Sequence, residues 1–183
     1  MTETQQKIAE NLDRQFSEMG FATQGVEALR EGANVSLRTL YKYFPSREAM
    51  VIGALDHRDA AYCDWICTDQ LRGADHVLHV LTRLADWLRE VSNTGCLFRN
   101  ALAAYPESDA IRDAVTTHKQ HVRDMFRARL IHVAPDCDVE ALSEALFILH
   151  EGLTESARLM GAEAATSATM RCARTLLAAA DIH

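Results

Sequence analysis

The clearest chemical signal in the chain is a short basic stretch, residues 36–47, within an acidic protein. The stretch has three basic side chains and no acidic one, whereas the 183-residue chain has a net charge of −7. Its basic and hydroxyl side chains are Arg38, Lys42, Arg47, Ser36, Thr39, Tyr41 and Tyr43. Donors of these types contact phosphates and base edges of nucleic acids. A solvated charged face is the alternative, although ordinary surfaces mix both signs. The net charge argues against a broadly basic coat, and the stretch predicts a local contact patch.

The cysteines suggest a second chemistry. Five occur, at positions 63, 67, 96, 137 and 172. An odd number in a chain of this size, with no apolar leader at its start, argues against a disulfide framework and for a reducing, cytoplasmic compartment. Cys96 follows Gly95 at a predicted helix start, a position where thiols can be reactive. Both a thiol switch at Cys96 and inert packing of the cysteines stay open.

Patterns for metal binding or catalysis are weak. The pairs His76/His79 and His118/His121 have the i, i+3 spacing of helical ligands, but no Cys or carboxylate constellation of known spacing accompanies them. The sequence contains no nucleophile elbow and no phosphate-binding loop. We therefore expect no metal, no cofactor and no enzymatic activity, and a helical enzyme is the alternative class.

Hydrophobic periodicity predicts an all-α protein of about nine helices. The first helix carries Ile8, Leu12, Phe16 and Met19 on one face and ends at Gly20. Two short helices follow, at 24–32 and 37–44, with a tight turn at 33–34. Six more are expected at 47–70, between 73 and 93, and at 96–105, 108–133, 136 or 138 to 160, and 164–180. No apolar run approaches the roughly 20 residues of a membrane helix.

Residues 16–48 have the layout of a helix-turn-helix, in which two short helices follow a longer one. The second short helix of such a unit enters the major groove of DNA. The predicted domains are a helix-turn-helix DNA-binding domain, residues 1–50, and a larger helical domain, residues 51–183. The fourth helix joins them directly, without a linker.

The residues of this segment also resemble a known family. The sequence FSEMGF at 16–21 is followed by VSLRTLYKYFPSRE at 35–48. Both parts are similar to the N-terminal domain of TetR-type transcriptional regulators. The resemblance implies a homodimeric DNA-binding regulator, most often a repressor, with a pocket for a small-molecule effector in its C-terminal domain. It also implies a palindromic operator.

The resemblance assigns roles within the segment. Lys42 and Arg47 would contact phosphates, and Thr39 and Tyr41 would position the recognition helix. Leu37 and Arg38 lie at its start, where side chains reach base edges. Arg38 stands where the family usually has glycine, and it either reads a guanine through two hydrogen bonds or contacts only a phosphate. The complete set of predicted DNA-contact residues is Thr23, Gln24, Ser36, Leu37, Arg38, Thr39, Tyr41, Lys42, Tyr43 and Arg47.

The last two helices favour a dimer. The eighth helix has two apolar faces and so requires more than one partner, and the ninth is rich in small residues. We expect a two-fold four-helix interface, with an intramolecular core as the alternative. The predicted interface residues are Leu142, Leu146, Leu149, Leu153, Met160, Met170, Ala173 and Leu177.

An effector pocket is expected among the fourth to eighth helices, because small-ligand sites are mostly apolar with a few polar groups. Its candidate lining residues are Tyr62, Trp65, Ile66, Trp87, Cys96, Phe98, Leu102, His118, Met125, Phe147 and His150. A core histidine hydrogen-bonded to a neighbour is the alternative for His118. The expected function is a dimeric repressor that a small molecule releases from its operator. The same regulator switched by oxidation or modification of Cys96 is the alternative.

Overall fold

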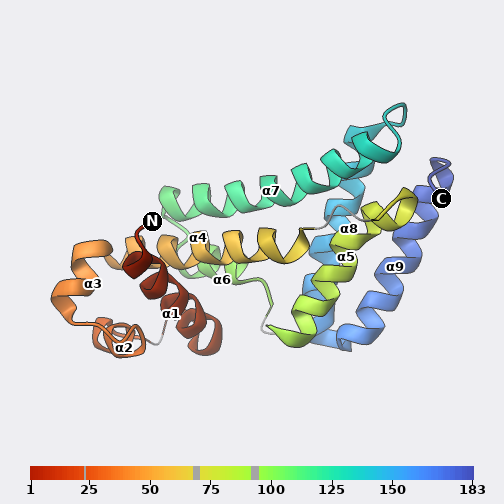
Figure 1. Ribbon diagram of the computed structural model, residues 1–183. Helices are drawn as coiled ribbons and strands as arrows, with labels where there is room; N and C mark the ends of the chain where they lie inside the picture. Colours follow the sequence, from red (N-terminus) through yellow and green to blue (C-terminus); the bar gives the residue numbers. More distant parts are fainter. Residues whose placement is uncertain (23, 68–70, 92–94) are drawn as a thin grey trace. The chain divides into compact units, whose positions relative to one another are not determined.

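The computed structural model describes residues 1–22, 24–67, 71–91 and 95–183. These residues form helices and no strands, which confirms the predicted all-α class. Their nine helices are α1 (Glu3–Met19), α2 (Val26–Gly32), α3 (Leu37–Tyr43), α4 (Arg47–Ile66), α5 (Gly73–Glu90), α6 (Leu97–Ala104), α7 (Asp109–Val133), α8 (Val139–Met160) and α9 (Ala162–Ala179) (Figure 1). Within the described ranges, none of the helices has the combination of length and apolar character needed to cross a bilayer.

The chain divides into two compact units. Unit 1 consists of Met1–Tyr62 and Cys96–His118, and unit 2 consists of Cys63–Gly95 and Lys119–His183. Both α4 and α7 contribute to each unit. Unit 1 thus contains α6 and the start of α7 in addition to the predicted N-terminal domain. The functional division at residue 50 stays a prediction.

Local signals in the sequence set the ends of the first helices. α1 stops at Gly20, whose φ of 75° suits glycine, and Asn34 adopts a φ of 53° in the turn between α2 and α3. The Ser36 hydroxyl caps α3 by accepting a hydrogen bond from the Thr39 N–H at 3.1 Å. Ser46 caps α4 in the same way. The end of α1 at Gly20 and the tight turn at Asn34 confirm predictions from the sequence.

Other helix starts differ from prediction by a few residues. α2 begins at Val26 rather than at residue 24, and its N-cap is Gly25, which supplies no side-chain acceptor. Thr23 lies outside the described residues. Asp138, one of the two predicted starts of the eighth helix, caps α8 through its carboxylate. These shifts are small because caps compete within a few residues of one another.

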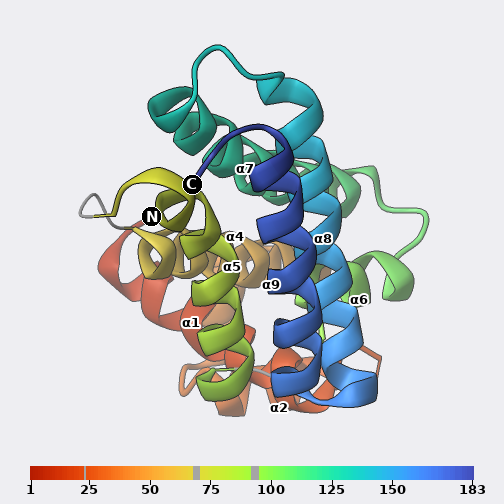
Figure 2. The ribbon, with the colours of Figure 1, turned by 90° about the vertical axis from the view of Figure 1, so that its right-hand side faces the viewer.

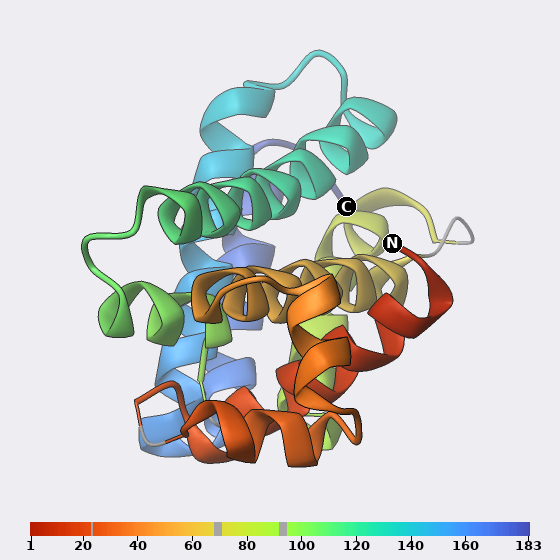
Figure 3. The ribbon, with the colours of Figure 1, turned by 90° about the vertical axis from the view of Figure 1, so that its left-hand side faces the viewer.

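The core of unit 1 is built from the apolar stripes of its short helices. Figure 3 shows α2 and α3 as a consecutive pair next to α1. Leu29 of α2 and Leu40 of α3 are fully buried. Further members of the same cluster are Ile8, Leu12, Phe16, Phe21, Phe44, Met50, Leu55, Leu97, Phe98, Ala101 and Ile111. This core fixes which face of α3 remains outside.

In unit 2, α9 packs against both α8 and α5, as Figure 2 shows. The stripe on α8 contains Leu146 and Leu153, and the stripe on α9 contains Ala173 and Leu177. All four side chains are completely buried within a single chain. The apolar stripes of these three helices thus pack against one another within the chain.

Candidate DNA-contact site

α3 presents opposite faces to the core and to solvent. Leu40 is buried in the core of unit 1, and Phe44, just after the helix, is 4% exposed. Arg38, Tyr41 and Lys42 are exposed, at spacings of three and four that place them on one face. The packing of unit 1 therefore turns a basic and aromatic face of α3 outward.

The electrostatics of this face favour an anionic partner. α3 has no acidic residue in its first turn, so the positive end of its dipole is not neutralised there. Within the described part of the chain, neither Arg38 nor Lys42 forms an ion pair. The Lys42 ammonium lies 5.1 Å from the centre of the half-buried Tyr43 ring. Two cationic side chains thus remain available to phosphates or base edges.

The start of α3 is organised by two hydroxyls. The Ser36 and Thr39 oxygens are 2.9 Å apart, and Ser36 also accepts the Thr39 N–H. Ser36 is exposed, whereas Leu37 and Thr39 are partly buried. This arrangement keeps the first turn of α3 rigid while leaving its outer surface accessible.

α2 contributes little positive charge. Arg30 donates to the carboxylates of Glu27 and Glu31, at 2.9 Å each. Both acidic partners are largely exposed. The charge available for a contact with DNA thus belongs to α3, as the sequence predicted.

Two predicted DNA-contact residues point inward. The Gln24 side chain is 8% exposed and donates to the carbonyls of Gln15 and Gly20. The Arg47 guanidinium donates to the carbonyls of Phe21 and Gln24. Both residues satisfy buried backbone acceptors, which are costly to leave unpaired. A phosphate contact by either side chain would have to compete with these bonds, and the predicted DNA contacts of Gln24 and Arg47 stay predictions. Thr23, a further predicted contact, lies outside the described residues.

A buried ionic cluster holds α1 against α4. The Asp13 carboxylate accepts the Arg58 Nε–H, shared between its two oxygens at 3.0 Å each, and a hydrogen bond at 2.9 Å from His57 Nδ1. Burial raises the pKa of Asp13, but the hydrogen bonds from His57 and Arg58 outweigh it and hold the pKa below its ordinary value. The cluster anchors the helix that precedes the helix-turn-helix.

Sequence reasoning missed this cluster and one further contact. Asp13 and Arg58 are 45 residues apart, and the Tyr105 hydroxyl meets Arg47 across 58 residues. No local pattern reports such distant pairs. One weak signal existed, because Asp13 adjoins the predicted apolar stripe of α1 at Leu12.

The predicted dimer residues separate into two groups. Leu146, Leu153, Ala173 and Leu177 are buried in the core between α5, α8 and α9 within one chain, and their predicted place in a dimer interface stays a prediction. Leu142, Leu149 and Met170 are partly buried, and Met160 is 54% exposed. Periodicity identifies an apolar stripe but not whether its partner belongs to the same chain.

The predicted effector residues of unit 1 partly come together. The Phe98 and His118 rings stack with centres 3.6 Å apart, and Tyr62 approaches His118 edge-on. His118 Nδ1 lies 2.7 Å from the Asp59 carboxylate, which fits the alternative of a core histidine with a neighbouring partner. Leu102 and Cys96 are partly buried against the same core.

The predicted effector residues of unit 2 form separate contacts. Trp65 and Trp87 meet edge to face at 5.8 Å, and His150 lies edge-on to Phe126. Ile66 is buried, Met125 is partly buried, and the Phe147 ring lies 4.7 Å from the Arg123 guanidinium. Burial lowers the pKa of His150, although its hydrogen bond to Glu151 opposes this. A role for these residues in effector binding stays a prediction.

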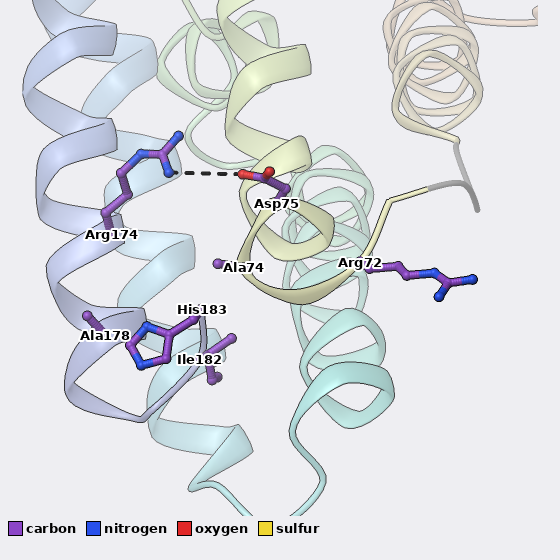
Figure 4. Close-up of a pocket in the computed structure, with 7 residues that line it drawn as sticks. All are labelled: Arg72, Ala74, Asp75, Arg174, Ala178, Ile182 and His183. Atoms are coloured by element: carbon purple, nitrogen blue, oxygen red, sulfur yellow. Dashed lines mark ion pairs between the residues drawn. The ribbon is translucent and has the colours of Figure 1, made fainter.

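A cavity of about 320 Å³ lies where α5 starts and α9 ends (Figure 4). Arg174 faces Asp75 across it at 4.0 Å, and the figure shows Arg72 directed away. Ala178, Ile182, His183 and Ala74 complete the lining. None of the predicted effector residues is among these seven.

Comparisons with known proteins find a family that the N-terminal segment matches. Residues 10–54 match the family described as "Bacterial regulatory proteins, tetR family". The N-terminal part of the chain is therefore similar to the TetR-type regulators. The match supports a DNA-binding transcriptional regulator rather than an enzyme, as the sequence predicted. No protein of the curated set matches the chain.

Solved structures of TetR-type regulators share the fold of this chain. A TetR-family regulator from Streptomyces coelicolor is 24% identical, with a TM-score of 0.86, over 98% of this chain and 90% of that one. A TetR-type regulator described as putative, from Streptomyces avermitilis, is 23% identical, with a TM-score of 0.81, over the full length of both. A cysteine mutant of the regulator CifR, complexed with 26-base-pair operator DNA, is 24% identical, with a TM-score of 0.73, over 92% and 95% of the two chains.

Proposed function

We propose that this protein is a homodimeric repressor that binds a palindromic operator and is released by a small-molecule effector. The observation that carries the proposal is the outer face of α3, where Arg38, Tyr41 and Lys42 are exposed beside an acid-free helix start. One such helix makes too few contacts for operator affinity, so two copies must bind together. Such a regulator acts where the chromosome lies, and we propose the cytoplasm as its compartment.

An apolar surface on α8 and α9 supports the dimer. Ile148 is 63% exposed and Leu159 is 90% exposed, and they lie on one stripe of α8 with Gly152 between them. Leu176 of α9 is 37% exposed and also faces outward. Exposed side chains of this size and grouping are typical of association surfaces. We propose that this face, rather than the buried stripe, meets the second copy.

Effector control requires unequal binding to two conformations. Major-groove half-sites recur at about 34–36 Å, so a shift of a few ångströms between two recognition helices prevents simultaneous docking. The cluster of Phe98, His118 and Tyr62 is the part of unit 1 that we propose for effector contact, because it combines aromatic faces with a polar group.

A thiol switch at Cys96 is a second candidate. The Cys96 sulfur caps α6 by accepting the Arg99 N–H at 3.5 Å, so oxidation or alkylation of the sulfur would change this cap. The comparison with CifR concerns a cysteine mutant of that protein. Substituting Cys96→Ser keeps a capping oxygen, and it should abolish a response to peroxide without lowering DNA affinity if the switch exists.

The proposal is tested by selecting fragments of the source genome with purified protein that has been unfolded and refolded to remove bound small molecules. We expect a palindromic sequence, bound at physiological salt and lost on combining Arg38→Ala with Lys42→Ala. Binding that ignores sequence and vanishes at moderate salt would overturn the proposed function. Genes beside a recovered palindrome then indicate the chemical class of the effector.

A further inference from the structure

Arg47 is the first residue of α4 and follows the recognition helix after three residues. All three nitrogens of its guanidinium donate hydrogen bonds within unit 1. Nη2 donates to the Phe21 carbonyl at 2.5 Å, Nη1 to the Gln24 carbonyl at 2.6 Å, and Nε to the Tyr105 hydroxyl at 2.7 Å. A phosphate contact would have to compete with these bonds.

One hydrogen bond of Arg47 links the two ends of the helix-turn-helix. Gln24 lies two residues before α2, and Arg47 begins the helix that follows α3, so the bond between them closes a loop that contains both short helices. The Gln24 side chain in turn binds the carbonyls of Gln15 and Gly20 in and after α1. The entry to α2 is thereby tied to the exit from α3.

Tyr105 brings a distant segment to the same guanidinium. It follows α6 directly as its C-cap residue, and its ring lies edge-on to Phe21 with centres 6.2 Å apart. Its hydroxyl is the acceptor for Arg47 Nε. The end of α6 and the turn before α2 thus share one planar group whose donor directions are fixed.

We propose that Arg47 is a positioning residue for DNA binding, and that Tyr105 couples α6 to the helix-turn-helix through it. Arg47 sets the angle between α2 and α3, and the Tyr105 hydroxyl holds Arg47 in place. This inference rests on the proposed function for its DNA readout. It also predicts a change in amide protection that does not depend on DNA.

The test compares full-length variants on the operator fragment recovered by the selection described above, over a series of salt concentrations. Lys42→Ala should weaken binding and lower the slope of log K against log salt by about 0.9 for each lost phosphate contact, or about 1.8 for a dimer. Arg47→Ala and Tyr105→Phe should weaken operator binding by about tenfold and about threefold with the slope unchanged. Arg47→Lys should behave like Arg47→Ala, because a lysine ammonium keeps the charge but lacks the planar guanidinium that makes all three hydrogen bonds.

Hydrogen exchange in the absence of DNA provides the second measurement. The amides of α2 should exchange several-fold faster in Arg47→Ala and Tyr105→Phe but not in Lys42→Ala. Ser108→Ala is the matched control, because Ser108 binds Glu48 at the same end of α4 without contacting the turn before α2. We expect it to leave both operator affinity and α2 exchange unchanged.

The outcomes separate the alternatives. A fall in the salt slope for Arg47→Ala that Arg47→Lys restores would show a phosphate contact and overturn the proposal. Unchanged affinity and unchanged α2 exchange in Tyr105→Phe would overturn the coupling to α6. If the unaltered protein binds no operator, the proposed function fails, and the exchange measurement still decides whether Arg47 positions α2.

Discussion

Arg38 stands at the start of α3 with an exposed side chain, where a recognition helix reaches base edges. Its guanidinium can form two parallel hydrogen bonds to a guanine, whereas the ammonium of Lys42 acts as a point charge suited to phosphate. The two cations on this face are thus expected to do different things. We expect Arg38 to select sequence and Lys42 to supply affinity.

Replacing Arg38 by alanine should relax base preference at one position in each half-site. The expected cost against the preferred base is about 1–3 kcal/mol per contact. Titration of operators that differ at single positions measures it. Lys42→Ala is the control, since it should weaken all operators alike. Equal weakening of every operator by Arg38→Ala would mean that Arg38 contacts phosphate instead.

At the scale of elements, buried polar groups decide how the helices of each unit are held. Asp13 and Arg58 join α1 to α4 in unit 1, and both are nearly inaccessible to solvent. In unit 2, Lys119 of α7 contacts Glu151 of α8 at 2.7 Å. Burial raises the pKa of Glu151, but its bonds to His150 and Lys119 lower it to about 2. Such contacts specify one packing among several that apolar stripes permit.

Substituting Asp13→Asn should destabilise the protein by about 3–5 kcal/mol, because it leaves the Arg58 cation buried without a counter-charge. The free energy of unfolding in urea measures this loss. The exposed pair of Lys7 and Glu3 is the control, and Glu3→Gln should change stability by less than about 1 kcal/mol. A loss of similar size in both variants would contradict a special role for the buried cluster.

Buried histidines should make stability fall in mild acid. Burial lowers the pKa values of His76, His79 and His150, so the folded protein binds fewer protons than the unfolded chain below about pH 6.5. The contribution of these neutral histidines to the free energy of unfolding is fully present above that pH. It decreases as the pH falls toward their pKa values in the folded protein. Melting curves between pH 7.5 and 5.5 should show the decrease. His150→Gln should reduce this pH dependence.

At the scale of the whole molecule, binding to a palindrome requires two recognition helices in a fixed relation. The exposed stripe of α8 and α9 is the surface that we propose for pairing, since the buried stripe already has partners in its own chain. Dimerisation and operator binding should therefore be lost together when that stripe is altered.

Ile148→Glu should convert the dimer to a folded monomer and weaken operator binding by more than tenfold, because it places a charge in an apolar interface. Light scattering coupled to gel filtration measures the mass. Ile131→Glu is the matched control, as Ile131 is 45% exposed on α7. An unchanged mass for Ile148→Glu would place the dimer interface elsewhere.

Much of the fold was predictable because its causes are local. The turn at Asn34, the cap at Ser36 and the end of α1 at Gly20 follow from the conformational preferences of single residues. The basic face of α3 was predictable as well, because a helical repeat places residues three and four apart together. The inward turn of Gln24 and Arg47 was not, since it depends on carbonyls and a hydroxyl supplied by other segments.

The sequence by itself determined the helical class, the helix-turn-helix and the chemistry of its recognition face, because periodicity, caps and charge are properties of neighbouring residues. Only the tertiary structure decided which apolar stripe is core and which is exposed, as at Leu146 and Ile148. It alone also joined Asp13 to Arg58 and Arg47 to Tyr105. The physical reason is that burial and long-range hydrogen bonds depend on which helices pack together, and helical periodicity does not specify the partner.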